Sequence, residues 1–372
     1  MALVEYRVYY TTTVGGTYTQ LSNVQNVTVN VGRQAQLDAY NANTASFVMR
    51  YPTGYASPNT ALVPGTLINI RIYNGPTYGE SNLFFGRIQN ATAEYGIPYS
   101  GGVGNADYLT VTCEGFFATL GRAPGSNYAM AANNVQVQCT NASTQSGFSI
   151  NSDSPLATWQ MGGTTVSTTW GDWLNKLVLT MNGRMTDGGS SVTVYSPYYR
   201  GTSASIYGNF SDAVKSSTNH PYQKINFWSL ADNYYTQVTV TPESYAAQST
   251  STGSAPYRQY AVNTINASTG QALDYANYLL NTYSTSNLKI ASITVLLNDC
   301  IQLPPYGSWA IGTALTVTFR GTTYNCILEG STFSGTPDAA YATFYLSSNE
   351  LNNYLILNDS VYGQLNNNRL GY

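Results

Sequence analysis

Charged residues are scarce in this chain. Aspartate, glutamate, lysine and arginine make up 9% of its 372 residues, against about 25% in an ordinary soluble domain. Its surface must therefore be built largely from hydroxyl, amide and phenol groups, including those of 33 tyrosines. Such a surface suits a protein that neighbouring subunits cover or that faces the extracellular medium.

Basic residues are few in particular. Lysine and arginine total 15 against 18 acidic residues, which gives a net charge of −3. A protein that holds DNA or RNA neutralises phosphates with clustered basic side chains. The composition thus excludes a nucleic-acid-binding protein, although DNA could pass such a surface without specific binding.

Long apolar runs are also absent. The first residues, Met1 to Arg7, carry charges where a signal peptide has its apolar core, and no stretch of 18 apolar residues follows. We therefore expect neither export by that route nor membrane insertion.

Catalytic motifs are missing as well. The single histidine, His220, precedes a proline in a polar stretch, which predicts a surface or linker position. No Gly-x-Ser-x-Gly motif accompanies it, so a triad hydrolase is excluded. A glycosidase needs only two facing carboxylates, but solvated strand faces are the preferred interpretation of Glu94, Glu114, Glu243 and Glu329. We predict no enzyme and no cofactor.

The cysteines lack the short spacing of zinc sites. Cys113 and Cys139 lie 26 residues apart, as do Cys300 and Cys326. The spacing permits two disulfides, but free cysteine is among the most buried residue types, which favours buried thiols.

What is present is mainly β pattern. Apolar residues alternate with polar ones in Val27 to Val31, in Val238 to Thr241 and in Ile293 to Val295, with Gly, Pro, Asn and Ser between such stretches. The fold class predicted is mainly β.

Two segments have helical spacing instead. From Thr169 to Met181, tryptophan and aliphatic residues fall on one face, and Asp172 lies near the positive end of the helix dipole. From about Ser268 to Asn281, alanine and leucine do the same, with Ser268 or Thr269 as the cap. Asp187-Gly188 then predicts a tight hairpin turn, which places a small α/β unit in residues 126–221.

An internal repeat is the most informative pattern. Pro64 to Arg71 resembles Ile311 to Thr318, and in both places two further strands follow. We interpret this as two related β-barrel domains, residues 1–125 and 222–372, that flank the small α/β domain, with one helix docked on the second.

Several motifs, taken in order, resemble a known family. They are Val31-Gly32-Arg33, Phe85-Gly86-Arg87-Ile88, Leu109 to Cys113, Leu355 to Asp359, Gly363-Gln364-Leu365 and Arg369-Leu370-Gly371. In this order they resemble the tail-tip baseplate-hub, or minor tail, proteins of long-tailed bacteriophages.

The resemblance implies a structural virion protein with tail-tube-like barrels. Such hubs form a ring around the tail axis, commonly a homotrimer, at the distal end of the tail, after synthesis in the host cytoplasm. They join the tail tube, tape-measure protein and distal tail protein to fibres or a spike, and form part of the genome-ejection channel. Family members often carry receptor-binding or wall-cleaving extensions after the second barrel, whereas this sequence stops at Tyr372.

The residues expected at interfaces come from strand edges, an aromatic pair and the C-terminal segment. They are Phe85, Arg87, Phe227, Trp228, Leu357, Asp359, Leu365 and Arg369. The alternative function is a surface carbohydrate-binding or adhesin protein, because tyrosine-rich loops such as Tyr195 to Arg200 can stack on sugars as well as anchor a protein interface.

Overall fold

A computed structural model of the chain defines its architecture. It describes residues 4–51, 61–73, 75–95, 106–197, 209–213, 219–228, 234–253, 258–284, 289–300, 311–336, 339–349, 354–355 and 369–370. Within these residues the chain is mainly β, as the sequence predicts.

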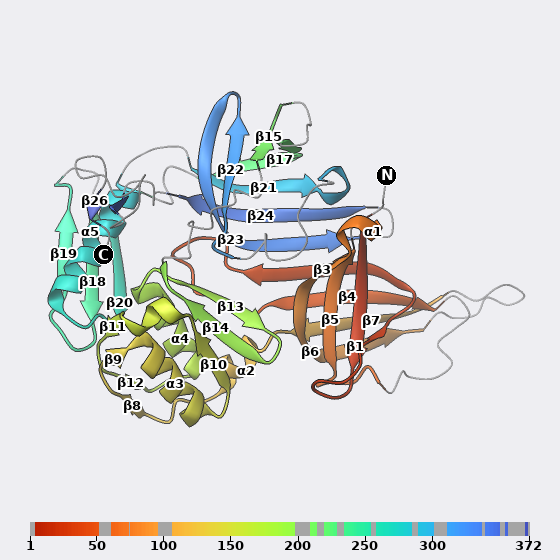
Figure 1. Ribbon diagram of the computed structural model, residues 1–372, viewed down its shortest axis with the longest axis horizontal. Helices are drawn as coiled ribbons and strands as arrows, with labels where there is room; N and C mark the ends of the chain where they lie inside the picture. The colour runs from red at the N-terminus through yellow and green to blue at the C-terminus, as the bar shows by residue number, and fades with distance from the viewer. Residues whose placement is uncertain are drawn as a thin grey trace, which may run out of the picture.

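One large sheet dominates the molecule (Figure 1). In order across the sheet, its strands are β16 (Asn219–Pro221), β15 (Asn209–Ser211), β22 (Ala314–Phe319), β23 (Thr322–Gly335), β3 (Val24–Gly32), β4 (Thr44–Tyr51), β7 (Asp107–Glu114), β6 (Glu80–Glu94), β5 (Leu67–Tyr73), β1 (Glu5–Thr11) and β2 (Thr19–Gln20). A branch leaves β23 through β24 (Ala340–Ser348), β21 (Ile290–Leu296) and β17 (Lys224–Phe227). A short helix, α1 (Gly75–Tyr78), links β5 to β6.

The sheet contains the same antiparallel unit twice. We call β5, β6 and β7 the first meander, and β22, β23 and β24 the second meander. In the first, Gly65 N–H donates to the carbonyl of Ile88 at 2.8 Å; in the second, Gly312 N–H donates to that of Leu328 at 2.6 Å. Both glycines have a positive φ, of 94° and 89°, which favours glycine.

The two meanders also share an irregularity. In each, the long central strand has a β-bulge one residue after this hydrogen bond, at Gln89 in β6 and at Glu329 in β23. The strand correspondence expected from the sequence repeat is thus present down to hydrogen-bond register. Whether each meander belongs to a separate barrel domain stays a prediction.

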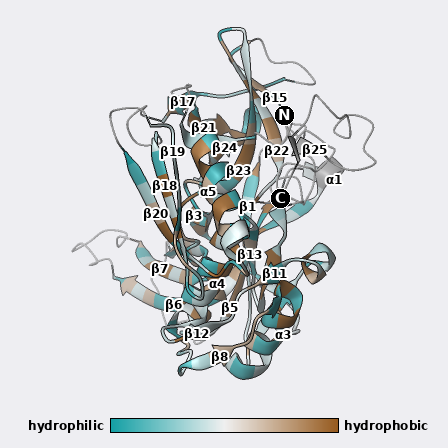
Figure 2. Cartoon of the chain, turned by 90° about the vertical axis from the view of Figure 1, so that its left-hand side faces the viewer, coloured by the Kyte–Doolittle hydropathy of each residue, from teal (hydrophilic) through white to brown (hydrophobic). Residues whose placement is uncertain are grey.

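A single apolar core runs through both meanders. It includes Phe47 and Phe84 from the first half of the sheet and Phe210 and Phe344 from the second, all at most 2% exposed. Figure 2 shows apolar and polar residues alternating along these strands. Full burial of each such side chain contributes about 1.5–3 kcal/mol.

A compact α/β unit packs beside the sheet and is seen below it in Figure 1. Its elements are α2 (Phe117–Arg122), β8 (Tyr128–Met130), β9 (Asn133–Asn134), α3 (Val135–Ser146), β10 (Ser149–Ser152), η1 (Ser154–Ala157), β11 (Gln160–Met161), β12 (Thr164–Val166), α4 (Trp170–Thr180), β13 (Arg184–Gly188) and β14 (Ser191–Tyr195). Its core lies around Trp170, Trp173 and Leu177. Within the proposed range 126–221, β15 and β16 lie outside this unit, in the large sheet.

Both predicted helices are confirmed. Helix α4 begins after Thr169, whose hydroxyl accepts from Asp172 N–H at 3.1 Å while the Asp172 carboxylate accepts from Thr169 N–H, a capping box. Helix α5 (Thr269–Tyr283) is capped by Ser268 and packs on a three-stranded sheet of β19 (Gln248–Ser251), β18 (Gln237–Pro242) and β20 (Gln259–Thr264). The remaining elements are η3 (Leu297–Asp299) and the pair β25 (Tyr354–Leu355) and β26 (Arg369–Leu370).

Two local expectations need correction, and one helix was missed. The predicted hairpin exists, but Asp187 and Gly188 lie within β13, and the turn is Gly189-Ser190, two residues further along. His220 is in strand β16, is 7% exposed and packs against Phe210 with ring centroids 5.7 Å apart, so the surface position was wrong. Proline does favour extended backbone there, but that extended segment pairs with β15. Helix α3 was not predicted.

The four cysteines are free and buried, as favoured above. Burial raises the pKa of the Cys113, Cys139 and Cys326 thiols to about 12. Among the described residues, no helix is long and apolar enough to cross a membrane.

Candidate assembly interface

The two halves of the sheet meet where β3 runs antiparallel to the second part of β23. Six residue pairs form this joint, from Val27 opposite Gly335 to Gly32 opposite Gly330. The partners are about 300 residues apart in sequence. The joint therefore fixes how the first and second meanders lie relative to one another.

A buried ion pair closes the end of the joint. Arg33 Nε lies 2.9 Å from Glu329 Oε2, and the two side chains are 2% and 1% exposed. Arg33 N–H also donates to the Glu329 carbonyl at 3.1 Å, and Ser347 Oγ donates to Glu329 Oε1. The guanidinium lies over the Tyr40 ring, 4.5 Å from its centroid. Because both charged side chains are buried, removal of either partner would strongly lower the free energy of unfolding.

Two glycines let the backbones approach at this point. A Cβ on Gly32 would lie 2.4 Å from the Glu329 carbonyl oxygen, and a Cβ on Gly330 would lie 2.4 Å from the Arg33 carbonyl oxygen. Gly32 also has φ of 78°. The Gly32-Arg33 pair quoted above for the family resemblance is therefore part of this joint, together with the bulge at Glu329.

Strand β13 ties the α/β unit to both meanders. Arg184 donates to the Ile311 carbonyl at the start of the second meander. Beside the first meander, Asp187 Oδ2 accepts a hydrogen bond from Asn43 N–H at 3.4 Å. Asn43 in turn accepts from Gly32 N–H at 3.2 Å through its side chain. The hydrogen bonds therefore link the α/β unit to the same joint.

Asp187 makes this link sensitive to pH. Burial raises the pKa of its carboxyl group to about 6, despite the opposing effect of backbone N–H groups, including that of Asn43. The folded chain thus holds this proton more tightly than the unfolded chain, whose aspartates titrate near pH 4. The contribution of Asp187 to the free energy of unfolding is most favourable below about pH 4 and falls as the pH rises through about 6.

We expect Asp187→Asn, whose amide stays neutral, to gain stability relative to the wild type on going from pH 4 to pH 7. The gain should reach up to about 3 kcal/mol, measured by urea unfolding at both pH values. If the difference in free energy of unfolding between Asp187→Asn and the wild type is the same at both pH values, the raised pKa of Asp187 is contradicted.

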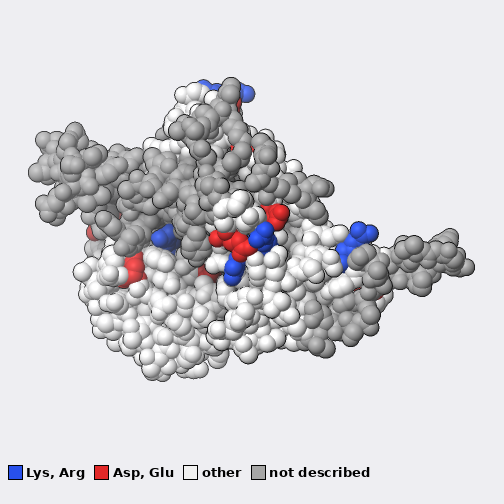
Figure 3. Space-filling view, turned by 45° about the vertical axis from the view of Figure 1, so that its right-hand side comes forward, with Lys and Arg blue, Asp and Glu red and all other residues white. Residues whose placement is uncertain are grey.

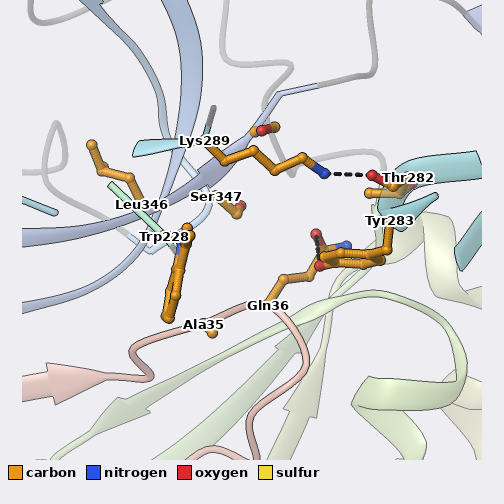
Figure 4. Close-up of a pocket in the computed structure, with 9 residues that line it drawn as sticks. Ala35, Gln36, Trp228, Thr282, Tyr283, Lys289, Leu346 and Ser347 are labelled. Carbon is orange, nitrogen blue, oxygen red and sulfur yellow. Dashed lines mark hydrogen bonds between the residues drawn. The ribbon is translucent and has the colours of Figure 1, made fainter. Parts of the chain in front are cut away.

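A small pocket lies beside the joint (Figure 4). Gln36 is held by its neighbours: its amide donates to Asn182 at 2.8 Å and Tyr278 at 3.0 Å, and its oxygen accepts from Tyr283 at 3.1 Å. Lys289 donates to the Thr282 carbonyl. The lining residues are Ala35, Gln36, Trp228, Thr282, Tyr283, Lys289, Leu346, Ser347 and Ser348. These bonds connect α5 to the sheet, which favours a structural role for the pocket over a ligand site.

On one face of the molecule, acidic and basic groups gather in a mixed patch. Figure 3 shows these groups side by side near the middle of that face, with a few further charged groups towards its edges. An ion-pair network of this mixed kind forms across β1, β5 and β6, where Glu80 pairs with Arg7 at 2.7 Å and with Arg71 at 3.0 Å. Tyr9 also donates to Glu80. Charges along an outer strand such as β1 discourage pairing with foreign strands.

The predicted interface residues fall in different places. Phe85 is half-buried and packs against Tyr18 and the Gly189 turn, while Arg87 is exposed. Phe227 packs on Phe319, with centroids 5.3 Å apart, and Trp228 lines the pocket. Arg369 is in β26, and Leu357, Asp359 and Leu365 lie outside the described residues. Their role at interfaces stays a prediction.

Three of the four candidate glycosidase acids are engaged in ion pairs. Glu329 pairs with Arg33, Glu114 with Arg122, and Glu243 with Lys176. The fourth, Glu94, is exposed on β6.

The sequence did not reveal the buried pair of Arg33 and Glu329 or the role of Asn43. The feature of the sequence that could have pointed to this joint was the Gly32-Arg33 pair directly after a strand.

No protein-family model and no curated protein matches the sequence. Among solved structures, a tail protein from Neisseria meningitidis MC58 matches with a TM-score of 0.63 and 13% identity, over 93% of this chain and 97% of that one. The fold is that of phage tail proteins. A 43 kDa prophage MuSo2 tail protein from Shewanella oneidensis matches with a TM-score of 0.64 and 10% identity, over 92% of this chain and 98% of that one. A prophage tail protein from Listeria monocytogenes EGD-e matches with a TM-score of 0.50 and 9% identity, over 91% and 94%.

Proposed function

We propose that this chain is a structural protein of a phage tail tip, the baseplate hub, without catalytic activity. The observation that carries the proposal is the agreement in fold with two tail proteins, one of them from a prophage, over 92–93% of this chain and 97–98% of theirs. The engagement of Glu114, Glu243 and Glu329 in ion pairs fits a structural use of these acids.

In this proposal the hub assembles with copies of itself, as a homotrimeric ring around the tail axis. It joins the tail tube, tape-measure protein and distal tail protein to the fibres or spike, and its lumen forms part of the channel through which DNA leaves. The scarcity of basic residues suits a passage in which DNA slides without being held. A surface poor in charge suits a protein whose faces are covered by neighbours.

Immunogold electron microscopy of particles from the source lysate, with antibody raised against the recombinant chain, tests this function. Gold confined to the distal end of phage tails is the expected result. Gold on cell envelopes, with tails bare, would contradict the hub and support a surface adhesin or carbohydrate-binding protein. Light scattering of the purified chain then tests the ring, for which the mass of three copies is expected.

A further inference from the structure

Along one edge of each central strand, β23 or β6, the bulge separates two stretches of backbone that can pair with another strand. In β23 both stretches are paired, whereas in β6 only the stretch before the bulge is paired within the described residues. In β23, Thr322 to Ile327 pair with β22 before the bulge, and Gly330 to Gly335 pair with β3 beyond it. In β6, residues Glu80 to Arg87 pair with β5, and Arg87 to Glu94 pair on the opposite edge with β7. Within the described part of the chain, no strand pairs with the first edge of β6 beyond its bulge.

The strand that covers β23 also has a counterpart. Strand β3 is joined to the first meander through β4 and β7, and β17 is joined to the second meander through β21 and β24 in the same antiparallel way. Strand β3 uses its other edge to pair with β23, whereas β17 is paired only with β21 among the described strands. Each chain thus contains one joint, formed by β3 and β23, and also the two strand edges, on β17 and β6, that could form a second joint of the same kind.

We propose that β17 of one copy pairs antiparallel with the part of β6 beyond its bulge in a second copy, as β3 pairs with β23 within one chain. This inference rests on the proposed ring function and names its contact surface. Because the two edges differ, the contact is heterologous: each copy offers β17 to one neighbour and β6 to the other. Repeated contacts of this kind close into a ring when the rotation permits.

The internal joint also supplies the register. Equivalent positions follow from residues that lie opposite one another on successive strands. In the first half these are Thr28, Ser46, Thr112 and Asn90, and in the second half they are Asn226, Ser292, Tyr345 and Gly330. Asn226 therefore corresponds to Thr28, and Asn90 corresponds to Gly330. Within the chain, Thr28 pairs with Ser334, four residues after Gly330. Between copies, Asn226 should therefore pair with Glu94, four residues after Asn90. The neighbouring pairs are then Ile225 with Tyr95 and Phe227 with Ala93.

The exposure of the two edges agrees with this assignment. In the internal joint, Gly330, Ser331, Phe333 and Gly335 are buried. Their counterparts on β6 are more exposed, and Tyr95 is 59% exposed. Pairing with β17 would cover that surface and would extend the apolar layer through Phe227 and Ala93, as Val29 and Phe333 do within the chain.

Charge on the outer face is complementary as well. Lys224 and Asn226 point to the same face of β17, because side chains alternate along a strand. In the inferred register, Lys224 is a diagonal neighbour of Glu94, and both are exposed. Diagonal neighbours across antiparallel strands are about 7–8 Å apart, within reach of long side chains.

Disulfide cross-linking of the full chain tests the contact. Directly opposed residues in antiparallel strands have Cα atoms about 4.5–5.5 Å apart, which suits a disulfide. The double variant Asn226→Cys with Glu94→Cys should give covalent dimers and larger species on a non-reducing gel after mild oxidation. Either single variant should give none, since it places a thiol on only one side of a heterologous contact, and the four native thiols are buried.

Two further double variants test register and face. Asn226→Cys with Thr92→Cys is displaced by two residues and should link less; Asn226→Cys with Ala93→Cys places the thiols on opposite faces and should not link. More efficient linking with Thr92→Cys than with Glu94→Cys would overturn the register. If the wild-type chain assembles but the Asn226–Glu94 pair does not link, the contact surface is wrong and the ring stands. A wild-type chain that stays monomeric contradicts the ring and the contact together.

Discussion

Replacing Arg33 with methionine is expected to lower the free energy of unfolding by about 3–5 kcal/mol. The change leaves the Glu329 carboxylate in place, 1% exposed, with Ser347 as a hydrogen-bond partner but without the Arg33 guanidinium that balances its charge. The loss should appear in urea unfolding followed by tryptophan fluorescence. It is large because desolvation of an ion is compensated only while its partner is present.

Two comparisons separate burial from charge. Arg122→Met removes an arginine that is 60% exposed and paired with Glu114, and should cost less than about 1 kcal/mol. The double variant Arg33→Met with Glu329→Leu removes both buried charges and should recover part of the loss. Equal losses for Arg33→Met and Arg122→Met would show that the buried pair does not hold the joint.

Replacing Gly330 with alanine should cost about 3 kcal/mol, because the added methyl group meets backbone that has no alternative position. It would lie 2.4 Å from the Arg33 carbonyl oxygen and 2.6 Å from that of Val31. Strands β3 and β23 must then separate at the end of their joint. Thermal unfolding, together with loss of the Arg33–Glu329 contact in a structure of the variant, would measure the effect.

Gly121→Ala is the matched control. Gly121 lies in helix α2, and a Cβ there would have no atom within 4 Å. Alanine favours a helix over glycine by up to about 1 kcal/mol, so this variant should be neutral or more stable. A Gly330→Ala variant as stable as the Gly121→Ala variant would show that β3 and β23 have room to adjust.

Local pattern was enough for several elements. The 3.6-residue period and cap residues of α4 and α5 act within one or two turns, so the sequence reveals them directly. The repeat was visible because Gly65 and Gly312 both adopt positive φ at equivalent turns, which restricts the residue type. Helix α3 escaped because its inner face includes Gln138, which donates to the carbonyls of Ala131 and Gly162 and leaves no clean apolar stripe.

Contacts between distant segments could not be predicted in the same way. Arg33 and Glu329 are 296 residues apart, and neither neighbourhood indicates that the other will be its partner. The position of His220 depended likewise on pairing with β15 rather than on its own flanking residues. The contact between Phe85 and the Gly189 turn of a different unit could not be read from its place on a strand either, and its predicted role at an interface stays a prediction.

The buried cysteines make each part of the molecule a reporter of its own opening. Cys113 lies in the first meander, Cys139 in the α/β unit, and Cys326 in the second meander. Since the thiolate is the reactive form and burial raises these pKa values to about 12, alkylation requires local unfolding. The order in which the three sites are modified would therefore give the order in which the three parts loosen, with no label introduced.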